Sequence, residues 1–188
     1  QGPLPALLED RPNMLVLRER PQPDPTTAET LDQWLNAGGV LLRFASPGLS
    51  EAPDAWLPVR LRPANRDLGG ALSWQKPQHL APFPEASPFA GLAVLDEVTV
   101  SRQVLADPGP ELRSKTWASL ADGTPLVTAE RRGQGWVVLV HVSADADWSN
   151  LPLSGLFLDM LDRLVRLGHG QAGADAGDLH LPPRLVLD

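Results

Sequence analysis

A strand–helix–strand pattern near the start of the chain constrains its fold more than any other feature. Residues 14–17 form a short apolar run, typical of a buried strand. Thr26 and Glu29 then have the spacing of a helix capping box, and one of the glycines at 38–39 is suited to end the helix. Residues 40–44 form a second apolar run. Two strands joined by one helix within about 30 residues make a βαβ unit, which requires the strands to be parallel.

Three apolar stretches in the second half of the chain predict an antiparallel meander. The pair Asp122-Gly123 separates residues 115–120 from residues 125–130, and a second glycine-containing turn leads into residues 136–142. An Asp-Gly pair between two strands is a strong hairpin signal. The last stretch is almost continuously apolar, so we expect it to be central in the sheet.

The pattern is weaker between these two regions. Residues 45–95 are interrupted by many prolines, which break regular structure. We expect only short strands there, at 59–62 and 71–74. Residues 98–104 broadly alternate between apolar and polar side chains, which predicts a half-buried strand.

A long amphipathic helix follows the meander. Ser149 or Asn150 can cap its amino end, and Pro152 suits its first turn. An apolar stripe with helical spacing runs from Leu153 to Val165, so this face should pack against the sheet.

The last part of the chain has a different composition from the rest. Residues 170–177 are small and flexible, as in a linker, and residues 185–188 begin like a strand with no evident partner. We therefore expect one α/β domain over residues 1–168, followed by a linker and a truncated C-terminal segment over residues 169–188.

Charge and cysteine content exclude several classes of function. The chain has 16 Lys and Arg against 23 Asp and Glu, a net charge of −7, which makes it a poor partner for nucleic acid. It has no cysteine, which excludes disulfides, thiolate metal sites, iron–sulfur clusters and a cysteine nucleophile. The EF-hand spacing is also missing. We expect neither a cofactor nor a resident metal ion.

Four stretches together resemble one region of a family of large, uncharacterised bacterial membrane proteins. They are residues 35–45 (LNAGGVLLRFA), 68–74 (LGGALSW), 87–92 (SPFAGL) and 148–157 (WSNLPLSGLF). Proteins of that family carry an aerotolerance-type N-terminal pair of transmembrane helices, a von Willebrand factor A-like segment and a C-terminal domain of unknown function. The region that residues 12–168 resemble looks like a class I glutamine amidotransferase domain.

This resemblance implies an α/β fold, specifically a flavodoxin-like, class I glutamine amidotransferase-like three-layer sandwich with an added antiparallel β meander. It also implies a domain anchored in the inner membrane through transmembrane segments that this chain does not contain, and located in the periplasm by the positive-inside rule. The partners implied are other domains of the same polypeptide or envelope proteins.

Amidotransferases of this class use a Cys-His-Glu triad, with the cysteine on a tight turn after a central strand. The corresponding turn here offers only Ser46, and Pro47 follows it without the N–H that would serve an oxyanion hole. A hydrolase would need Ser46 as nucleophile, His141 as base and Asp145 as its orienting carboxylate. Since His141 lies in an apolar strand, a hydrogen-bonded core histidine is the better interpretation, and a non-catalytic scaffold or interaction domain is favoured over an enzyme.

A binding module is the alternative. In open α/β sheets, ligands bind beyond the carboxyl ends of the strands, where we expect Ser46, His141, Asp145, Asp147 and Trp148. The two aspartates and the histidine could also hold a divalent cation, although an Asp-X-Asp turn is the simpler interpretation. Sugar binding is a further option, because three of the six tryptophans (Trp56, Trp74 and Trp148) lie in loop-rich segments.

Overall fold

The computed structural model describes residues 4–17, 23–62, 72–169 and 184–186. In chain order its elements are α1 (Leu4–Glu9), β1 (Met14–Leu17), α2 (Pro25–Asn36), β2 (Val40–Phe44), α3 (Pro47–Glu51), β3 (Leu72–His79), β4 (Thr99–Gln103), α4 (Leu112–Lys115), β5 (Thr116–Ser119), β6 (Pro125–Arg132), β7 (Gly135–Val140), the 3-10 helix η2 (Leu151–Leu153), α5 (Gly155–His169) and β8 (Arg184–Val186).

The architecture is α/β, as the sequence predicts. Six strands form a mixed sheet in the order β5-β6-β7-β2-β1-β8. β1 and β2 are parallel neighbours joined through α2, so the predicted βαβ unit is confirmed. β5, β6 and β7 form the predicted antiparallel meander, and β7 lies inside the sheet between β6 and β2. β3 and β4 pair separately as a two-stranded antiparallel sheet.

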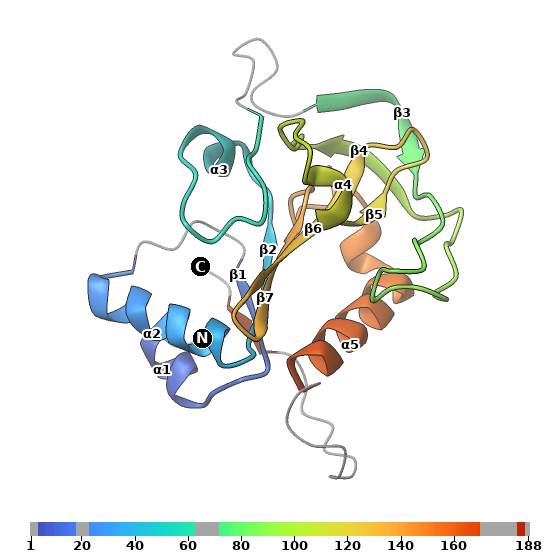
Figure 1. The fold of residues 1–188 in the computed structure, drawn as a ribbon. Helices are drawn as coiled ribbons and strands as arrows, with labels where there is room; N and C mark the ends of the chain where they lie inside the picture. Colours follow the sequence, from blue (N-terminus) through green and yellow to red (C-terminus); the bar gives the residue numbers. More distant parts are fainter. Residues whose placement is uncertain (1–3, 18–22, 63–71, 170–183, 187–188) are drawn as a thin grey trace.

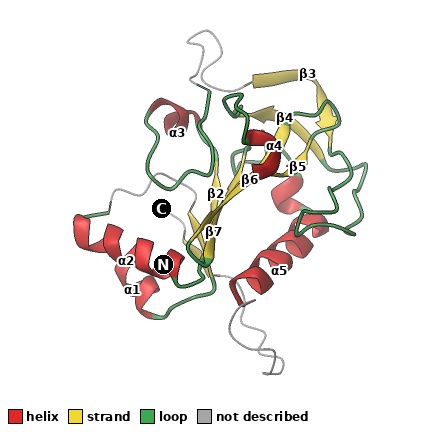
Figure 2. Cartoon of the chain, in the orientation of Figure 1, coloured by secondary structure: helices red, strands yellow, loops and turns green. Residues whose placement is uncertain are grey.

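Helices cover both faces of the large sheet. α1 and α2 lie on one face, whereas α5 lies on the other, together with the β3–β4 pair (Figures 1 and 2). The alternation of side chains along β1 explains the two cores: Leu15 and Leu17 pack on the α2 side, and Val16 packs on the α5 side. Because each strand in the middle of the sheet is covered twice, β2 and β7 can be apolar at nearly every position.

The amino end of α2 differs from the prediction. Asp24 is the cap, and its carboxylate accepts hydrogen bonds from the backbone N–H groups of Thr26 and Thr27 at 3.0 and 3.2 Å. Pro25 occupies the first turn, where its missing N–H is not needed. The predicted capping box of Thr26 and Glu29 is therefore wrong, because the helix begins before Thr26. The predicted glycine end is confirmed by Gly38, whose φ of +117° suits only glycine.

The start of α5 is also later than predicted. Ser154 caps it, since its hydroxyl accepts a hydrogen bond from the N–H of Phe157 at 3.2 Å. The expected caps instead hold β4: Ser149 donates to the carbonyl of Thr99, and Asn150 accepts from its N–H. Leu153 consequently lies outside the helix, and 77% of it is exposed, so its assignment to the buried stripe is wrong.

Two further predictions about strands need correction. β8 pairs in parallel with β1, so the C-terminal strand-like residues do have a partner. The expected strand at 59–62 is reduced to an isolated bridge between Leu61 and Ala106, and the strand expected at 71–74 is β3, which extends to His79. The predicted linker at 170–177 lies outside the described residues, and the division of domains at residue 168 stays a prediction.

Candidate functional site

Ser46, the hydroxyl group considered as a nucleophile, follows the carboxyl end of β2. It is the N-cap of α3, and its Oγ accepts a hydrogen bond from the N–H of Leu49 at 3.3 Å. Pro47 is the first residue of that helix. A serine with an extended backbone followed by proline is a favourable helix start, so this turn has a complete structural explanation.

His141 follows β7, the strand beside β2, and is completely buried. Its Nδ1 lies 2.8 Å from the carbonyl oxygen of Val104, and its Nε2 lies 2.9 Å from the hydroxyl of Thr128. A carbonyl can only accept, so Nδ1 carries the proton and the hydroxyl of Thr128 donates to Nε2. Burial lowers the pKa of His141 to about 4, despite the hydrogen bond to Val104, which raises it. The interpretation of His141 as a hydrogen-bonded core histidine is confirmed.

The other three predicted residues lie in the loop after His141. Asp145 and Asp147 are exposed, and the carboxylate of Asp145 accepts a hydrogen bond from the hydroxyl of Ser143 at 2.7 Å. Trp148 is buried, and its carbonyl accepts from backbone N–H groups of β4. The contacts of Asp145 order the turn before η2, as the simpler interpretation of this aspartate predicts.

The structure therefore brings two of the five residues to neighbouring strand ends without joining them. Phe44 and Val140 are partners at the ends of β2 and β7, which places Ser46 and His141 at the same edge of the sheet. Both nitrogens of His141 are already bonded elsewhere, so neither can receive a proton from Ser46 without breaking a buried hydrogen bond. None of the five residues lines either of the two pockets described below. In the part of the chain that the structure describes, no group of three or more His, Asp or Glu could hold a metal ion.

The loop tryptophans do not form an exposed platform where their side chains are described. Trp56 and Trp148 are 7% and 8% exposed. The indole N–H of Trp56 donates to Asp32 of α2 at 2.8 Å, which anchors the loop against this helix. The side chain of Trp74 lies outside the described residues.

A loop on the α2 side of the sheet is held by three cations. Residues 53–60, which we call the strap, have no helix or strand, so their carbonyls need other donors. Arg132 donates to the carbonyl of Ala55, Arg43 donates to that of Trp56, and Lys115 donates to that of Pro58, at 3.1, 2.9 and 3.2 Å. These cations come from three different strands or helices, so the strap is fixed to several parts of the domain.

The tightest of these attachments is a buried ion pair. Nη1 of Arg43, in the middle of the sheet, lies 2.6 Å from Oδ1 of Asp54, with side chains 1% and 8% exposed. The same oxygen accepts the N–H of Trp56 at 2.9 Å. Nε of Arg43 and Oδ2 of Asp54 are buried without a hydrogen-bond partner. Arginine in this apolar strand is a signal that sequence reasoning could have used, because a buried arginine nearly always has an acidic partner.

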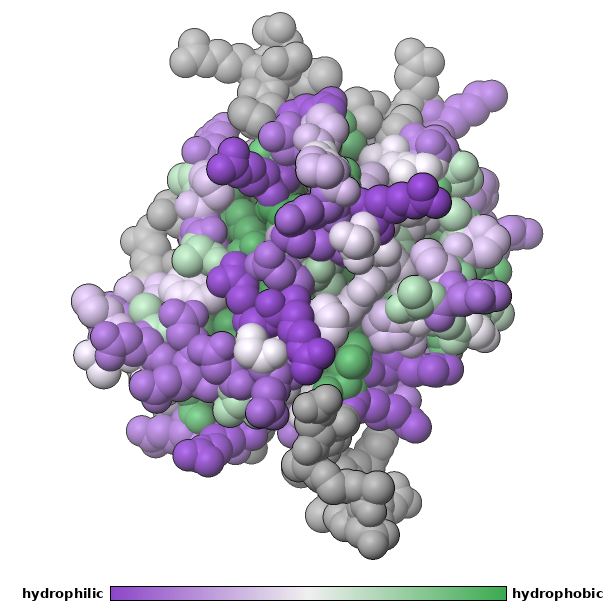
Figure 3. All heavy atoms as spheres, in the orientation of Figure 1, coloured by the Kyte–Doolittle hydropathy of each residue, from purple (hydrophilic) through white to green (hydrophobic). Residues whose placement is uncertain are grey.

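Beside the strap lies an open groove of about 660 Å³, which we call the charged groove. The strap and the Pro108–Leu112 turn form its walls, and Lys115, Glu130 and Arg132 lie between them. Glu130 forms ion pairs with Lys115 and with Arg132, each with an N–O distance of 2.8 Å. Figure 3 shows mostly hydrophilic residues across this face of the molecule.

The contacts within the groove shift the pKa values of Lys115 and Glu130. The hydrogen bond to Glu130 raises the pKa of Lys115 above its usual value. Burial alone would raise the pKa of Glu130, but the hydrogen bond from Lys115 and the charge of Arg132 outweigh it and lower that pKa. These residues are far apart in the sequence and carry no motif, so sequence reasoning missed them.

Comparisons with known proteins support the fold and go no further. No protein-family model and no curated protein sequence matches the chain. Among solved structures, the cytoplasmic protein STM3548 from Salmonella typhimurium is 13% identical, covers 88% of this chain and 74% of its own, and has a TM-score of 0.60. The cytoplasmic protein STM1381 from Salmonella typhimurium LT2 is also 13% identical, with a TM-score of 0.53, and the match covers 78% of this chain and 60% of that one.

At this level of identity the two matches establish a shared α/β fold and leave function open. The helices of the described part of the chain add one negative finding: none is long and apolar enough to cross a membrane.

Proposed function

We propose that this chain is a non-catalytic, amidotransferase-like domain that acts as a scaffold or interaction module. The finer fold proposed with it is the flavodoxin-like three-layer sandwich that the sequence resemblance implies. The observation that carries the proposal is the state of His141. It is the base that a serine hydrolase would need, and it is buried, neutral and bonded through both ring nitrogens.

The energetic argument against a hidden catalytic state starts from the same contacts. Freeing Nε2 would leave the hydroxyl of Thr128 without its partner, and one lost buried hydrogen bond costs about 1–3 kcal/mol. A general base also works best with a pKa near the operating pH. The pKa of His141 is lowered to about 4, so it would take up a proton poorly at neutral pH.

The charged groove supports the interaction half of the proposal. Three segments distant in sequence form it, and prolines at 53, 58, 108 and 110 stiffen its walls. Three carbonyls of its strap accept hydrogen bonds from cations on other elements, which restrains the conformation of this surface. A preformed polar surface loses little entropy on binding another domain. The partners proposed are other domains of the same polypeptide or envelope proteins, in a protein anchored in the inner membrane with this domain in the periplasm.

A direct assay tests the non-catalytic half. The purified chain is incubated with activated esters, γ-glutamyl anilides and glutamine, next to a Ser46→Ala variant. We expect no turnover above the buffer rate from either protein. Turnover by the unmodified chain that vanishes in Ser46→Ala would overturn the proposal.

Hydrogen exchange tests the interaction half. We compare residues 53–60 and 107–112 in the isolated chain and in a longer polypeptide that contains it, and expect slower exchange in the longer polypeptide. Equal exchange would argue against docking through the groove.

A further inference from the structure

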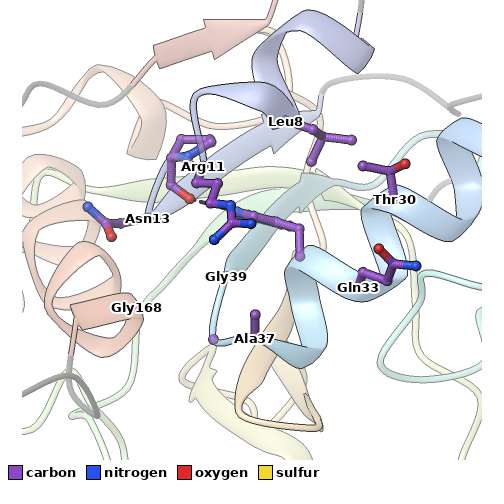
Figure 4. Close-up of a pocket in the computed structure, with 11 residues that line it drawn as sticks. Leu8, Arg11, Asn13, Thr30, Gln33, Ala37, Gly39 and Gly168 are labelled. Carbon is purple, nitrogen blue, oxygen red and sulfur yellow. Dashed lines mark hydrogen bonds between the residues drawn. The ribbon is translucent and has the colours of Figure 1, made fainter.

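A second polar hollow lies at the opposite edge of the sheet from Ser46 and His141. It has a volume of about 330 Å³ and sits where the turn between α1 and β1 faces the carboxyl end of α2 (Figure 4). Gly38 and Gly39 at the end of α2 and Gly168 of α5 complete its wall. Packing explains two of these glycines, because a Cβ on Gly39 would meet the ring of Trp34 and a Cβ on Gly168 would meet the carbonyl of Asn13.

The charge of this pocket is opposite to that of the whole chain. Arg11 is the one charged residue among those that line it, and the lining includes no carboxylate. The chain as a whole has a net charge of −7. Gln33, which also lines the pocket, carries a carboxamide that can donate hydrogen bonds. In Figure 4 the side chain of Arg11 extends into the space between Asn13 and the part of α2 that bears Gln33.

The guanidinium of Arg11 has no acidic partner in the part of the chain that the structure describes. The side chain is exposed, and no ion pair joins it to an acidic residue in the described ranges. Capping of α2 does not need it either. The carbonyls of the last four helical residues, 33 to 36, accept backbone N–H groups from Ala37, Gly39, Gly38 and Gln134 respectively. The positive charge is thus available to a ligand.

The backbone of Arg11 is in a conformation that arginine disfavours. Its φ is +44°, and it is the one residue other than glycine with a positive φ in the described part of the chain. Its N–H bonds to the carbonyl of Leu8, as at a left-handed helix end, where glycine is the preferred residue. Unfavourable backbone conformations persist at ligand-binding positions, where the side chain they place has a use. The turn that carries Arg11 is attached to α2, because the indole N–H of Trp34 donates to the carbonyl of Pro12 at 2.7 Å.

We propose that this pocket binds a small oxyanion, a carboxylate or phosphate group, through the guanidinium of Arg11. Two parallel N–H groups of a guanidinium match the two oxygens of such an anion, and the carboxamide of Gln33 provides a further donor. The partial negative charge at the carboxyl end of α2 opposes the anion, but it is smaller than the full charge of Arg11. This site is independent of the charged groove and of the proposed scaffold function.

The test compares binding with stability in one variant. The chain is titrated with inorganic phosphate and with acetate at constant ionic strength, and the Nε–Hε signal of Arg11 and the backbone amides of residues 11–13 and 37–39 are followed by NMR. We expect saturable shifts with a dissociation constant on the order of 1 mM for at least one anion. Arg11→Gly should abolish them while raising Tm by about 2–4 °C, since glycine accepts the positive φ.

Two controls separate the ligand from a structural effect. Arg11→Lys keeps the charge but loses the two-pronged geometry, so binding should weaken several-fold and not vanish. Arg163→Ala, which removes another exposed arginine on α5, should leave the titration unchanged. The proposal is overturned if the unmodified chain shows no saturable shift with either anion. It is equally overturned if Arg11→Gly binds as tightly as the unmodified chain. Neither outcome would bear on the hydrolase assay or the groove.

Discussion

Two buried polar centres lie on or beside the middle strands of the sheet, and they are built in opposite ways. His141 is neutral, and each of its ring nitrogens has a partner, Thr128 or Val104. Arg43 is paired with Asp54 through a single contact, and one polar atom on each side chain is left without a hydrogen bond. His141 and Arg43 are both almost fully buried, so the difference between the centres lies in charge and in how completely the hydrogen bonds are satisfied.

The comparison shows that burial alone does not identify a functional group. The His141 centre is closed: it needs no ligand and has no accessible nitrogen. The Arg43 centre is costly by comparison, because two charges have been moved out of water and only partly compensated. This pair holds the strap in position, since Arg43 and Asp54 together bind its backbone at Trp56. The ion pair thus fixes the strap, which forms one wall of the charged groove.

The largest effect is expected from removing the acidic partner in the Arg43 centre. Asp54→Ala should lower the free energy of unfolding by about 3–5 kcal/mol, because it leaves a buried arginine without a counter-charge. Urea denaturation followed by fluorescence measures it. The double variant Arg43→Met/Asp54→Asn removes both charges and keeps the acceptor for the Trp56 N–H, so it should be more stable than Asp54→Ala. A double variant as unstable as the single one would contradict the cost assigned to the unpaired charge.

The next effect concerns the His141 centre and depends on pH. The folded chain holds this histidine near a pKa of about 4, whereas an unfolded histidine has a pKa near 6.5. Between these values the unfolded state binds a proton that the folded state does not, so stability falls as the pH falls. It is fully present above about pH 6.5, and about 3 kcal/mol is lost by about pH 4.

Denaturation at several pH values measures this loss, and His141→Gln is the matched control because it cannot titrate. The difference in unfolding free energy between the two proteins should shrink steadily from pH 7 to pH 4. Parallel pH profiles for the two proteins would show that His141 is not the neutral, closed centre described here.

The smallest effect is expected where the charges are partly exposed. Lys115→Met removes the bonds to Glu130 and to the carbonyl of Pro58, from a side chain that is 23% exposed. We expect a loss of roughly 1 kcal/mol or less, since water screens such pairs. Arg166→Met, which breaks the exposed pair with Asp162 on α5, is the control and should cost still less. A loss of unfolding free energy in Lys115→Met as large as that in Asp54→Ala would contradict the distinction between the buried and the partly exposed ion pairs.

Periodicity explains which parts of the fold the sequence could predict. β1 and β2 are continuously apolar because both faces of the sheet are covered, and α2 has one apolar face because one side packs on the sheet. The meander is marked by glycine turns whose φ is positive at Gly123 and Gly133. Helix ends were less predictable, because several short polar residues compete as caps. Ser154 caps α5, whereas the side chains of Ser149 and Asn150 form hydrogen bonds with the backbone of β4, about fifty residues earlier in the chain.

The candidate sites were harder to predict for a different reason. His141 could be interpreted correctly from its position in an apolar strand. The charged groove joins side chains from segments as distant as Pro58 and Lys115, and no local pattern reports such a meeting. Arg11 is inconspicuous in the sequence, because neither its positive φ nor the absence of acidic neighbours in its pocket can be seen without coordinates.

The position of β2 between β1 and β7 has a consequence for how the chain folds. One edge of β2 pairs with β1, which is close in sequence. The other edge pairs with β7, which follows on the order of a hundred residues later. During synthesis an apolar strand therefore keeps an open edge until residues 135–140 have emerged. Such edges recruit other chains, and long-range pairing slows folding toward milliseconds to seconds. The same central strand that makes the finished sheet stable is thus the segment most exposed to misassembly while the chain is incomplete.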